Sequence, residues 1–194
     1  MPHGEEQLLT TLKRVVSVLK QVDVPYALAG GFAVYARGGT SSDHDVDFLI
    51  RKRDADTALD ALGAAGFRTE RPPEDWLVKV YDGGRLVDLI FRPVERPVTE
   101  QTLAAAEPLR VDSVQLPVMP ATVLMIHKML TFSQHYCDYA KALPMARSLR
   151  EQIDWHEVRR ETAESPYAEA FLFLLHRLGL LTANHNGVLI QEAG

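Results

Sequence analysis

Disulfide bonds, membrane spans and an excess of positive charge are all missing from this 194-residue sequence. Its one cysteine, Cys137, has no partner within the chain, which excludes a disulfide-stabilised scaffold and favours a reducing compartment. No apolar run approaches the roughly 18 residues of a membrane helix. The first residues, MPHGEEQLL, also lack the cationic start and apolar stretch of a signal peptide. We therefore expect a cytoplasmic protein that makes no membrane contact.

Lys and Arg number 21 against 26 Asp and Glu, which gives a net charge of −5. This balance excludes a nucleic-acid binder that relies on general positive charge, although it leaves room for a local basic pocket. Hydrophobic residues make up 46% of the chain and charged residues 24%. That composition provides enough apolar material for a core and excludes a disordered chain.

Helical and strand patterns alternate over the first 119 residues. Apolar residues at helical spacing predict a helix over residues 5–21, and Gly66 ends a second helix over residues 53–65. Shorter helices are expected over residues 32–36 and 99–107. Short apolar runs predict strands, the last pair before residue 92 joined by an Asp-Gly-Gly hairpin turn. The expected strands cover residues 26–29, 45–50, 67–70, 76–81, 85–91 and 114–119.

The pattern becomes helical from Pro120 onward. Pro120 suits the first position of a helix, Asp154 is a candidate N-cap, and Pro166 opens a last helix to residue 180. We therefore predict the α+β class. A small mixed β-sheet with flanking helices is expected over residues 1–119, followed by a C-terminal helical bundle over residues 120–194.

An Asp-x-Asp motif in a predicted strand is the most informative feature. Because side chains alternate along a strand, Asp45 and Asp47 share one face, and Val46 and Phe48 point to the core. Asp88 is again the polar member of an alternating strand. Carboxylates on one face repel one another unless a cation compensates them, and Mg²⁺ prefers oxygen ligands. The three aspartates therefore predict a metal site for two Mg²⁺ ions, one on a triphosphate and one lowering the pKa of an attacking hydroxyl.

Gly30 and Gly31 lie between the first predicted strand and a helix start. Glycine in this place lets backbone amides approach phosphate oxygens, and the helix start adds partial positive charge. The alternative interpretation is a tight turn without a ligand. Further candidates for triphosphate contacts are hydroxyls and cations: Arg37, Thr40, Ser41, Ser42 and Lys79.

The order of strand, Gly-Gly, short helix, Ser/Thr loop and Asp-x-Asp resembles the DNA polymerase β-like nucleotidyltransferase superfamily. Asp88, in LVDLIF, resembles its third carboxylate. The whole chain is similar to the AbiEii/MenT group of toxin nucleotidyltransferases, whose helical C-terminal part carries a Lys and then an Asp. The matching residues are Lys128 in LMIHKMLTF and Asp138 in YCDYAKAL. The resemblance implies a nucleotidyltransferase core with these catalytic residues: Asp45, Asp47, Asp88, Lys128 and Asp138.

Enzymes of this kind bind a nucleoside triphosphate with Mg²⁺, transfer the nucleotidyl group and release pyrophosphate. The resemblance implies the 3′ end of tRNA as acceptor, whose extension blocks aminoacylation and translation; a pyrimidine nucleotide is the expected donor. It also implies a prokaryotic, cytoplasmic toxin with a cognate antitoxin. Some such antitoxins phosphorylate a Ser or Thr near the catalytic aspartates, and Thr40, Ser41 and Ser42 occupy that kind of position.

Other functions stay open at this point. The order Thr-x-x-x-His-Asp-Val-Asp from Thr40 to Asp47 also resembles aminoglycoside and lincosamide nucleotidyltransferases, whose acceptor is an antibiotic. A third interpretation is an inert nucleotide-binding module, against which the intact aspartates argue. An alternative interpretation of Lys128 is a lysine that extends from a helix surface into solvent and has no role toward phosphate. The best candidate for a general base is Asp88, acting directly or through a metal.

Overall fold

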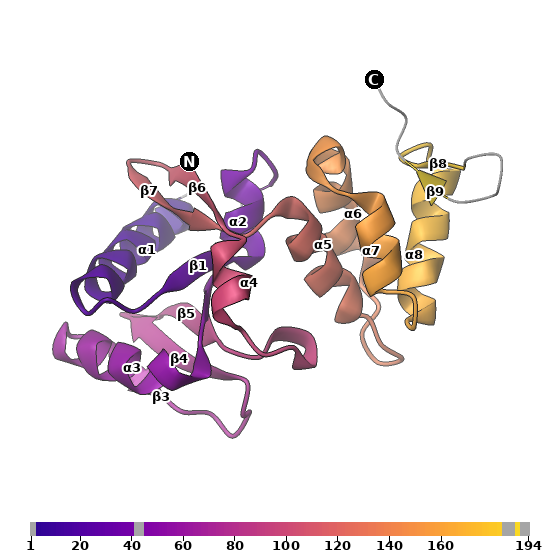
Figure 1. Cartoon of the computed structure of the whole chain (residues 1–194). Helices are drawn as coiled ribbons and strands as arrows, with labels where there is room; N and C mark the ends of the chain where they lie inside the picture. The colour runs from indigo at the N-terminus through magenta and orange to yellow at the C-terminus, as the bar shows by residue number, and fades with distance from the viewer. Residues whose placement is uncertain (1–2, 41–44, 184–188, 191–194) are drawn as a thin grey trace. The chain divides into compact units, whose positions relative to one another are not determined.

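The computed structural model describes residues 3–40, 45–183 and 189–190. These fall into two units (Figure 1). The first is built from the described residues of Met1–Ala36 and Ser41–Met119, and the second from those of Arg37–Thr40 and Pro120–Gly194. Within the described ranges, no helix combines the length and the apolar character that a membrane crossing needs.

A seven-stranded mixed sheet forms the centre of the first unit, in the order β3-β4-β5-β2-β1-β7-β6. The central strand β2 runs antiparallel to β1 and parallel to β5. The α+β class is therefore confirmed. The strands are β1 (Tyr26–Ala29), β2 (Asp45–Ile50), β3 (Arg68–Glu70), β4 (Leu77–Asp82), β5 (Arg85–Ile90), β6 (Glu107–Val111) and β7 (Val114–Val118).

Two helices, α1 (His3–Gln21) and α3 (Ala55–Ala64), lie side by side against this sheet (Figure 1). Helix α1 contributes a buried apolar stripe that includes Leu12, Val15 and Leu19. From the sheet, Phe48 and Ile50 are also fully buried. Burying such a side chain stabilises the fold by about 1.5–3 kcal/mol, so β2 is fixed in the core by one of its faces. Two shorter helices, α2 (Gly30–Ala36) and α4 (Glu100–Ala104), complete the first unit.

The helix expected over residues 99–107 is shorter in the structure, and part of that range belongs to a strand that the sequence did not predict. Helix α4 ends at Ala104, and β6 begins at Glu107. Pro108 weakens the strand signal of this segment, because proline cannot donate a ladder hydrogen bond. The sheet order places β6 at an edge, where proline is tolerated, and β6 returns into β7 through a turn in which Asp112 has a φ of 52°.

The second unit is mainly helical, as expected from the sequence. Its helices are α5 (Ala121–Leu130), α6 (Tyr139–Ser148), α7 (Trp155–Glu161) and α8 (Pro166–Arg177). The aromatic rings of Phe132, Tyr139 and Phe171 pack against one another with centroids 5.1–5.7 Å apart. Two short antiparallel strands, β8 (Thr182–Ala183) and β9 (Leu189–Ile190), were not predicted, because two-residue strands are too short for a detectable pattern.

Candidate active site

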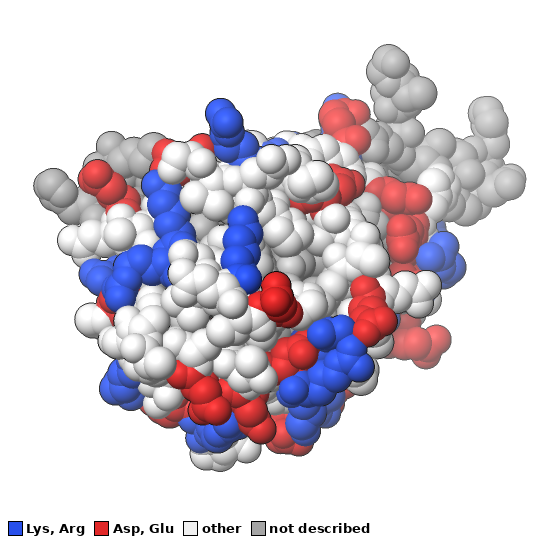
Figure 2. Space-filling view, turned by 60° about the vertical axis from the view of Figure 1, so that its left-hand side comes forward, with Lys and Arg blue, Asp and Glu red and all other residues white. Residues whose placement is uncertain are grey.

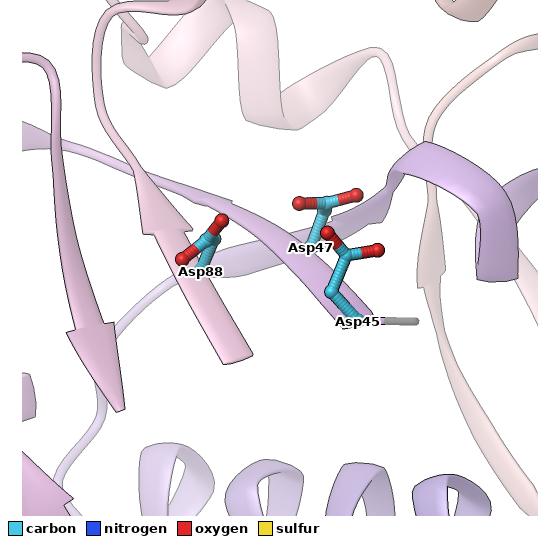
Figure 3. A group of neighbouring side chains, drawn as sticks. All are labelled: Asp45, Asp47 and Asp88. Atoms are coloured by element: carbon cyan, nitrogen blue, oxygen red, sulfur yellow. The ribbon is translucent and has the colours of Figure 1, made fainter. Parts of the chain in front are cut away.

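Asp45, Asp47 and Asp88 converge on one face of the sheet, and we call them the aspartate cluster. Each offers a carboxylate oxygen, and these oxygens all lie within 4.8 Å of one another. Figure 3 shows the first two side chains on one strand and the third on its neighbour, with their oxygens turned toward a common space. The parallel pairing of β2 and β5 causes this convergence, because it sets Asp47 directly beside Asp88.

Negative charge in the cluster is poorly compensated. Burial, together with the charges of Asp45 and Asp88 and against the lowering effect of Lys79, raises the pKa of Asp47 to about 8. Burial also raises the pKa of Asp88, despite a hydrogen bond from Lys79 that favours its charged form. An all-oxygen donor set with surplus negative charge suits a hard divalent cation such as Mg²⁺. The residues present therefore fit the metal that the sequence predicts.

Gly30 has a packing role that differs from the phosphate contact expected of it. Its φ is +57°, and a Cβ built on it would lie 1.7 Å from Oδ2 of Asp47. The pairing of Ala29 with Asp47 brings the start of α2 against this carboxylate. Only glycine accommodates both the backbone angle and the close approach. Gly31 follows within α2, and the role of both glycines toward phosphate stays a prediction.

Lys79 lies beside the cluster, where it contacts a carboxylate. It stands directly across from Asp88 in the antiparallel β4–β5 ladder, and its Nζ donates to Oδ1 of Asp88 over 3.1 Å. The two side chains are only 24% and 12% exposed, so water screens this ion pair weakly. Burial lowers the pKa of Lys79, but the hydrogen bond and charge of Asp88 outweigh it and leave that pKa raised.

The hairpin that carries Lys79 and Asp88 is fastened to α1 by a second buried carboxylate. Asp82 accepts a hydrogen bond from Thr11 Oγ1 at 2.7 Å and forms an ion pair with Arg14. Arg85, across the turn, contributes another ion pair at 3.2 Å. Burial raises the pKa of Asp82, but these hydrogen bonds outweigh it and leave the pKa lowered. Asp82 thus positions the strands from which the site is built.

The remaining phosphate candidates are placed only in part. Arg37 and Thr40 belong to the second unit, where the backbone oxygen of Arg37 accepts a hydrogen bond from Gln152 at 2.9 Å. Thr40 is exposed. Ser41 and Ser42 lie outside the described residues. The predicted contacts of all four with a triphosphate therefore stay predictions.

The two candidates in the C-terminal part, Lys128 and Asp138, are both in the second unit. Nζ of Lys128 lies 5.8 Å from the ring centroid of Tyr136, within cation–π range. Asp138 is the N-cap of α6 and accepts a hydrogen bond from the backbone N–H of Lys141 at 3.3 Å. This capping role is structural, and an Asp directly before a helical pattern is a signal that predicts it from sequence. The catalytic roles of both residues stay predictions.

Sequence reasoning missed two features of the site: the fit of Gly30 against Asp47 and the ion pair of Lys79 with Asp88. No sequence pattern predicts the fit of Gly30 against Asp47, because this fit depends on how β1 and β2 pair. The second was accessible from the hairpin. A two-residue Gly83-Gly84 turn pairs Asp82 with Arg85, and counting outward by three residues on each side pairs Lys79 with Asp88.

Comparisons with known proteins agree with this geometry. A family model described as "Uncharacterised nucleotidyltransferase" matches residues 4–193. No curated protein matches the chain significantly.

Among solved structures, the antibiotic-resistance factor ANT(2'')-Ia aligns with a TM-score of 0.61 and 14% identity, over 90% of this chain and 99% of its own. The lincosamide antibiotic adenylyltransferase LnuA aligns with a TM-score of 0.52 and 12% identity, over 70% and 94%. An antigenic nucleotidyltransferase-like protein from Paracoccidioides brasiliensis gives 0.57 and 18%, over 90% and 89%. At these identities the likeness establishes the fold.

Proposed function

The chain belongs to the uncharacterised nucleotidyltransferase family whose model matches residues 4–193, and from this premise we propose that it transfers a nucleotide from a nucleoside triphosphate to the 3′ end of tRNA. Nucleotide transfer follows from the family. The acceptor and the residue roles below are our proposal. The observation that carries it is the convergence of Asp45, Asp47 and Asp88, with oxygens within 4.8 Å of one another, on the sheet.

The aspartate cluster binds two divalent cations in this proposal. When bound, Mg²⁺ neutralises phosphate charge and lowers the pKa of the acceptor hydroxyl. The hydroxyl oxygen forms a bond to the α-phosphorus, the bond from that phosphorus to the β-phosphate oxygen breaks, and pyrophosphate leaves with the electron pair. Asp88 is the candidate base that takes the hydroxyl proton, because its pKa is raised above that of an ordinary carboxylate.

Contacts to the triphosphate come, in this proposal, from the start of α2 and the polar residues near it. Gly30 and Gly31 offer backbone N–H groups, and Lys79 offers an ammonium already beside the cluster. Arg37 and Lys128 supply further positive charge, and Asp138 assists catalysis as the family resemblance implies. The expected donor is a pyrimidine nucleotide.

A tRNA end fits a protein that lacks general positive charge, because only the terminal nucleotides must enter the site. Residues 1–36 and 41–119 hold 13 Lys and Arg against 18 Asp and Glu, whereas the rest of the chain holds 8 of each. Figure 2 shows acidic and basic side chains interspersed along the lower part of the face it presents. Contact along a long phosphate backbone would require a more basic surface.

Regulation by an antitoxin completes this proposal. A cognate antitoxin phosphorylates Thr40, Ser41 or Ser42 and thereby adds nearly two negative charges in the segment just before Asp45. The added charge repels the triphosphate. A Thr40→Glu variant is expected to incorporate labelled nucleotide much more slowly than wild type, while Thr40→Val, which removes the hydroxyl alone, keeps most of the rate. Equal rates in all three proteins would contradict this regulation.

An antibiotic is the second candidate acceptor. ANT(2'')-Ia, described as an antibiotic-resistance factor, aligns over 99% of its own length, and LnuA, a lincosamide antibiotic adenylyltransferase, over 94%. The surplus of acidic residues in the first unit also suits a cationic drug such as an aminoglycoside.

One experiment separates the two acceptors. The purified protein is incubated with Mg²⁺ and each labelled nucleoside triphosphate in turn, with either total tRNA or a set of aminoglycosides and lincosamides. We expect label on tRNA, most with CTP or UTP, and none with Asp45→Ala. Label on an antibiotic alone would replace the tRNA proposal by the second candidate. Absence of label from both would contradict both acceptors.

A further inference from the structure

The ion pair between Lys79 and Asp88 gives the aspartate cluster an internal counter-ion. Among the described residues, Asp88 is the carboxylate of the three that accepts a hydrogen bond from a lysine, at 3.1 Å from Nζ to Oδ1. It is also the most buried of the three, with 8% of its surface exposed. The other two members of the cluster, Asp45 and Asp47, lie on β2. Within the described residues, neither forms a hydrogen bond or an ion pair with a lysine. The site therefore has one carboxylate in direct contact with an ammonium and two that feel Lys79 at most through its charge.

The sheet itself enforces this division. Lys79 and Asp88 are direct cross-strand partners, and their neighbours Val78, Val80, Val87 and Leu89 are buried on the other face. Lys79 therefore lies on the face of the sheet that carries the aspartate cluster. An ammonium held at Asp88 repels a divalent cation that approaches the same carboxylate, so the two compete for the negative charge of Asp88.

We infer that Lys79 is a positioning residue that occupies Asp88 in the nucleotide-free protein, so that a cation binds first to Asp45 and Asp47 and reaches Asp88 only when Lys79 leaves it. This rests on the proposed function, because it concerns the same metal site. The triphosphate supplies the reason for Lys79 to leave, since its oxygens offer the ammonium new acceptors. Lys79 thus makes full occupation of the metal site depend on the substrate.

Mn²⁺ binding to the metal-stripped, full-length protein without nucleotide tests this inference. Mn²⁺ accepts the same oxygen ligands as Mg²⁺, and the electron paramagnetic resonance signal of the free ion reports how much is bound. We expect Lys79→Met to strengthen Mn²⁺ binding about tenfold, because the competing ammonium is gone. The matched control is Lys52→Met, which removes an exposed lysine whose partner is Asp75 at 2.9 Å. It is expected to bind as wild type does.

A double-mutant cycle with Asp88→Asn separates competition at Asp88 from a general charge effect. In the Asp88→Asn background, Lys79→Met is expected to leave Mn²⁺ binding unchanged. A gain that persists in this background would overturn the inference, as would equal affinities for Lys79→Met and Lys52→Met. Lys79→Gln, which keeps a hydrogen-bond donor without the charge, is a second variant that must show the same gain.

A purely structural role predicts a different result. If Lys79 only joined β4 to β5, Lys79→Met would unfold at a lower temperature and Mn²⁺ affinity would not rise. Protein that shows the expected Mn²⁺ gain but labels neither tRNA nor antibiotic would contradict the acceptor proposals and leave the inference standing. Active transfer combined with unchanged Mn²⁺ affinity in Lys79→Met would overturn the inference alone.

Discussion

Two carboxylates in the same sheet, Asp47 and Asp82, have opposite electrostatic surroundings. Both lose water on folding. Asp82 is met by Thr11, Arg14 and Arg85, and these partners leave its pKa lowered. Burial and the neighbouring aspartates instead raise the pKa of Asp47 to about 8. Asp82 is thus a carboxylate whose charge the protein satisfies internally, whereas the environment of Asp47 has surplus negative charge that would suit a cation.

Because their surroundings differ, mutating Asp47 is expected to reduce activity, whereas mutating Asp82 is expected to reduce stability. The largest expected effect is the loss of activity at Asp47. Asp47→Asn keeps the size of the side chain but removes a proposed metal ligand, so transfer is expected to fall by on the order of 10³-fold or more. Because the substitution also relieves repulsion, the metal-free variant is expected to unfold at a temperature no lower than wild type. Labelled-nucleotide transfer and circular dichroism in EDTA measure the two effects. Retained turnover would place the metal site elsewhere.

Gly30→Ala tests whether Asp47 depends on the close approach of the backbone. The new Cβ would fall 1.7 Å from Asp47 Oδ2, so the carboxylate must move. We expect activity to drop by about 10²-fold, as for ångström-scale misplacement of a reacting group.

The matched control for this substitution is Gly66→Ala. Gly66 also has a positive φ, +89°, but no atom lies within 4 Å of its added Cβ. The Gly66→Ala variant therefore tests backbone strain alone. We expect it to lose about 1 kcal/mol of stability and to transfer nucleotide at the wild-type rate. Equal activity losses in the two variants would show that the Gly30 contact has no special role.

Asp82→Asn should reverse the pattern seen at Asp47. Removing the charge leaves Arg14 and Arg85 without their shared partner, and we expect about 3 kcal/mol of lost stability, since breaking a buried pair costs about 3–5 kcal/mol and Arg14 is partly exposed. Chemical denaturation measures this loss. Mn²⁺ affinity of the folded variant should match wild type, and a large change in that affinity would mean that Asp82 belongs to the site rather than to its support.

The last prediction concerns the pH dependence of the stability of the metal-free protein. Folded Asp47 keeps its proton up to about pH 8, whereas the unfolded chain releases it near 3.8. Its contribution to stability is therefore largest at low pH, falls between pH 3.8 and about 8, and is constant above that. Asp82, with a lowered pKa, contributes in the opposite sense, and its stabilisation is lost in acid.

Thermal unfolding in EDTA between pH 5 and pH 9 measures this difference. We expect the decline of the unfolding temperature with rising pH to be weaker in Asp47→Asn than in wild type. Saturating Mg²⁺ should stabilise wild type more at pH 8.5 than at pH 6, because the proton competes with the metal. The same decline in both proteins would contradict the raised pKa of Asp47.

Local patterns were sufficient to predict much of this architecture from sequence. Alternation along β2 gave the shared face of Asp45 and Asp47, and the Gly83-Gly84 turn gave the β4–β5 hairpin. The C-terminal helices followed from apolar periodicity. These features depend on neighbours within a few residues, which is where sequence patterns are most informative.

Long-range pairing accounts for what sequence could not supply. The parallel contact of β2 with β5, which sets Asp47 beside Asp88, joins segments separated by a helix and two strands. The edge position of β6 made Pro108 compatible with a strand, but edge positions are known only once the sheet order is known. The fit of Gly30 on Asp47 depends on tertiary distances in the same way.

The length of the β4–β5 hairpin fixes the positions of both carboxylates, because its register sets where Asp82 and Asp88 lie relative to the turn. Asp82 beside the turn meets α1, and Lys79 and Asp88, nine positions apart, meet at the site. Adding one residue to either strand would turn its later side chains to the opposite face. Divergence among descendants of this protein should therefore keep Lys79, Asp82 and Asp88 and almost never alter the length of the hairpin, so that an insertion or deletion there is expected to mark a lineage that has lost the site.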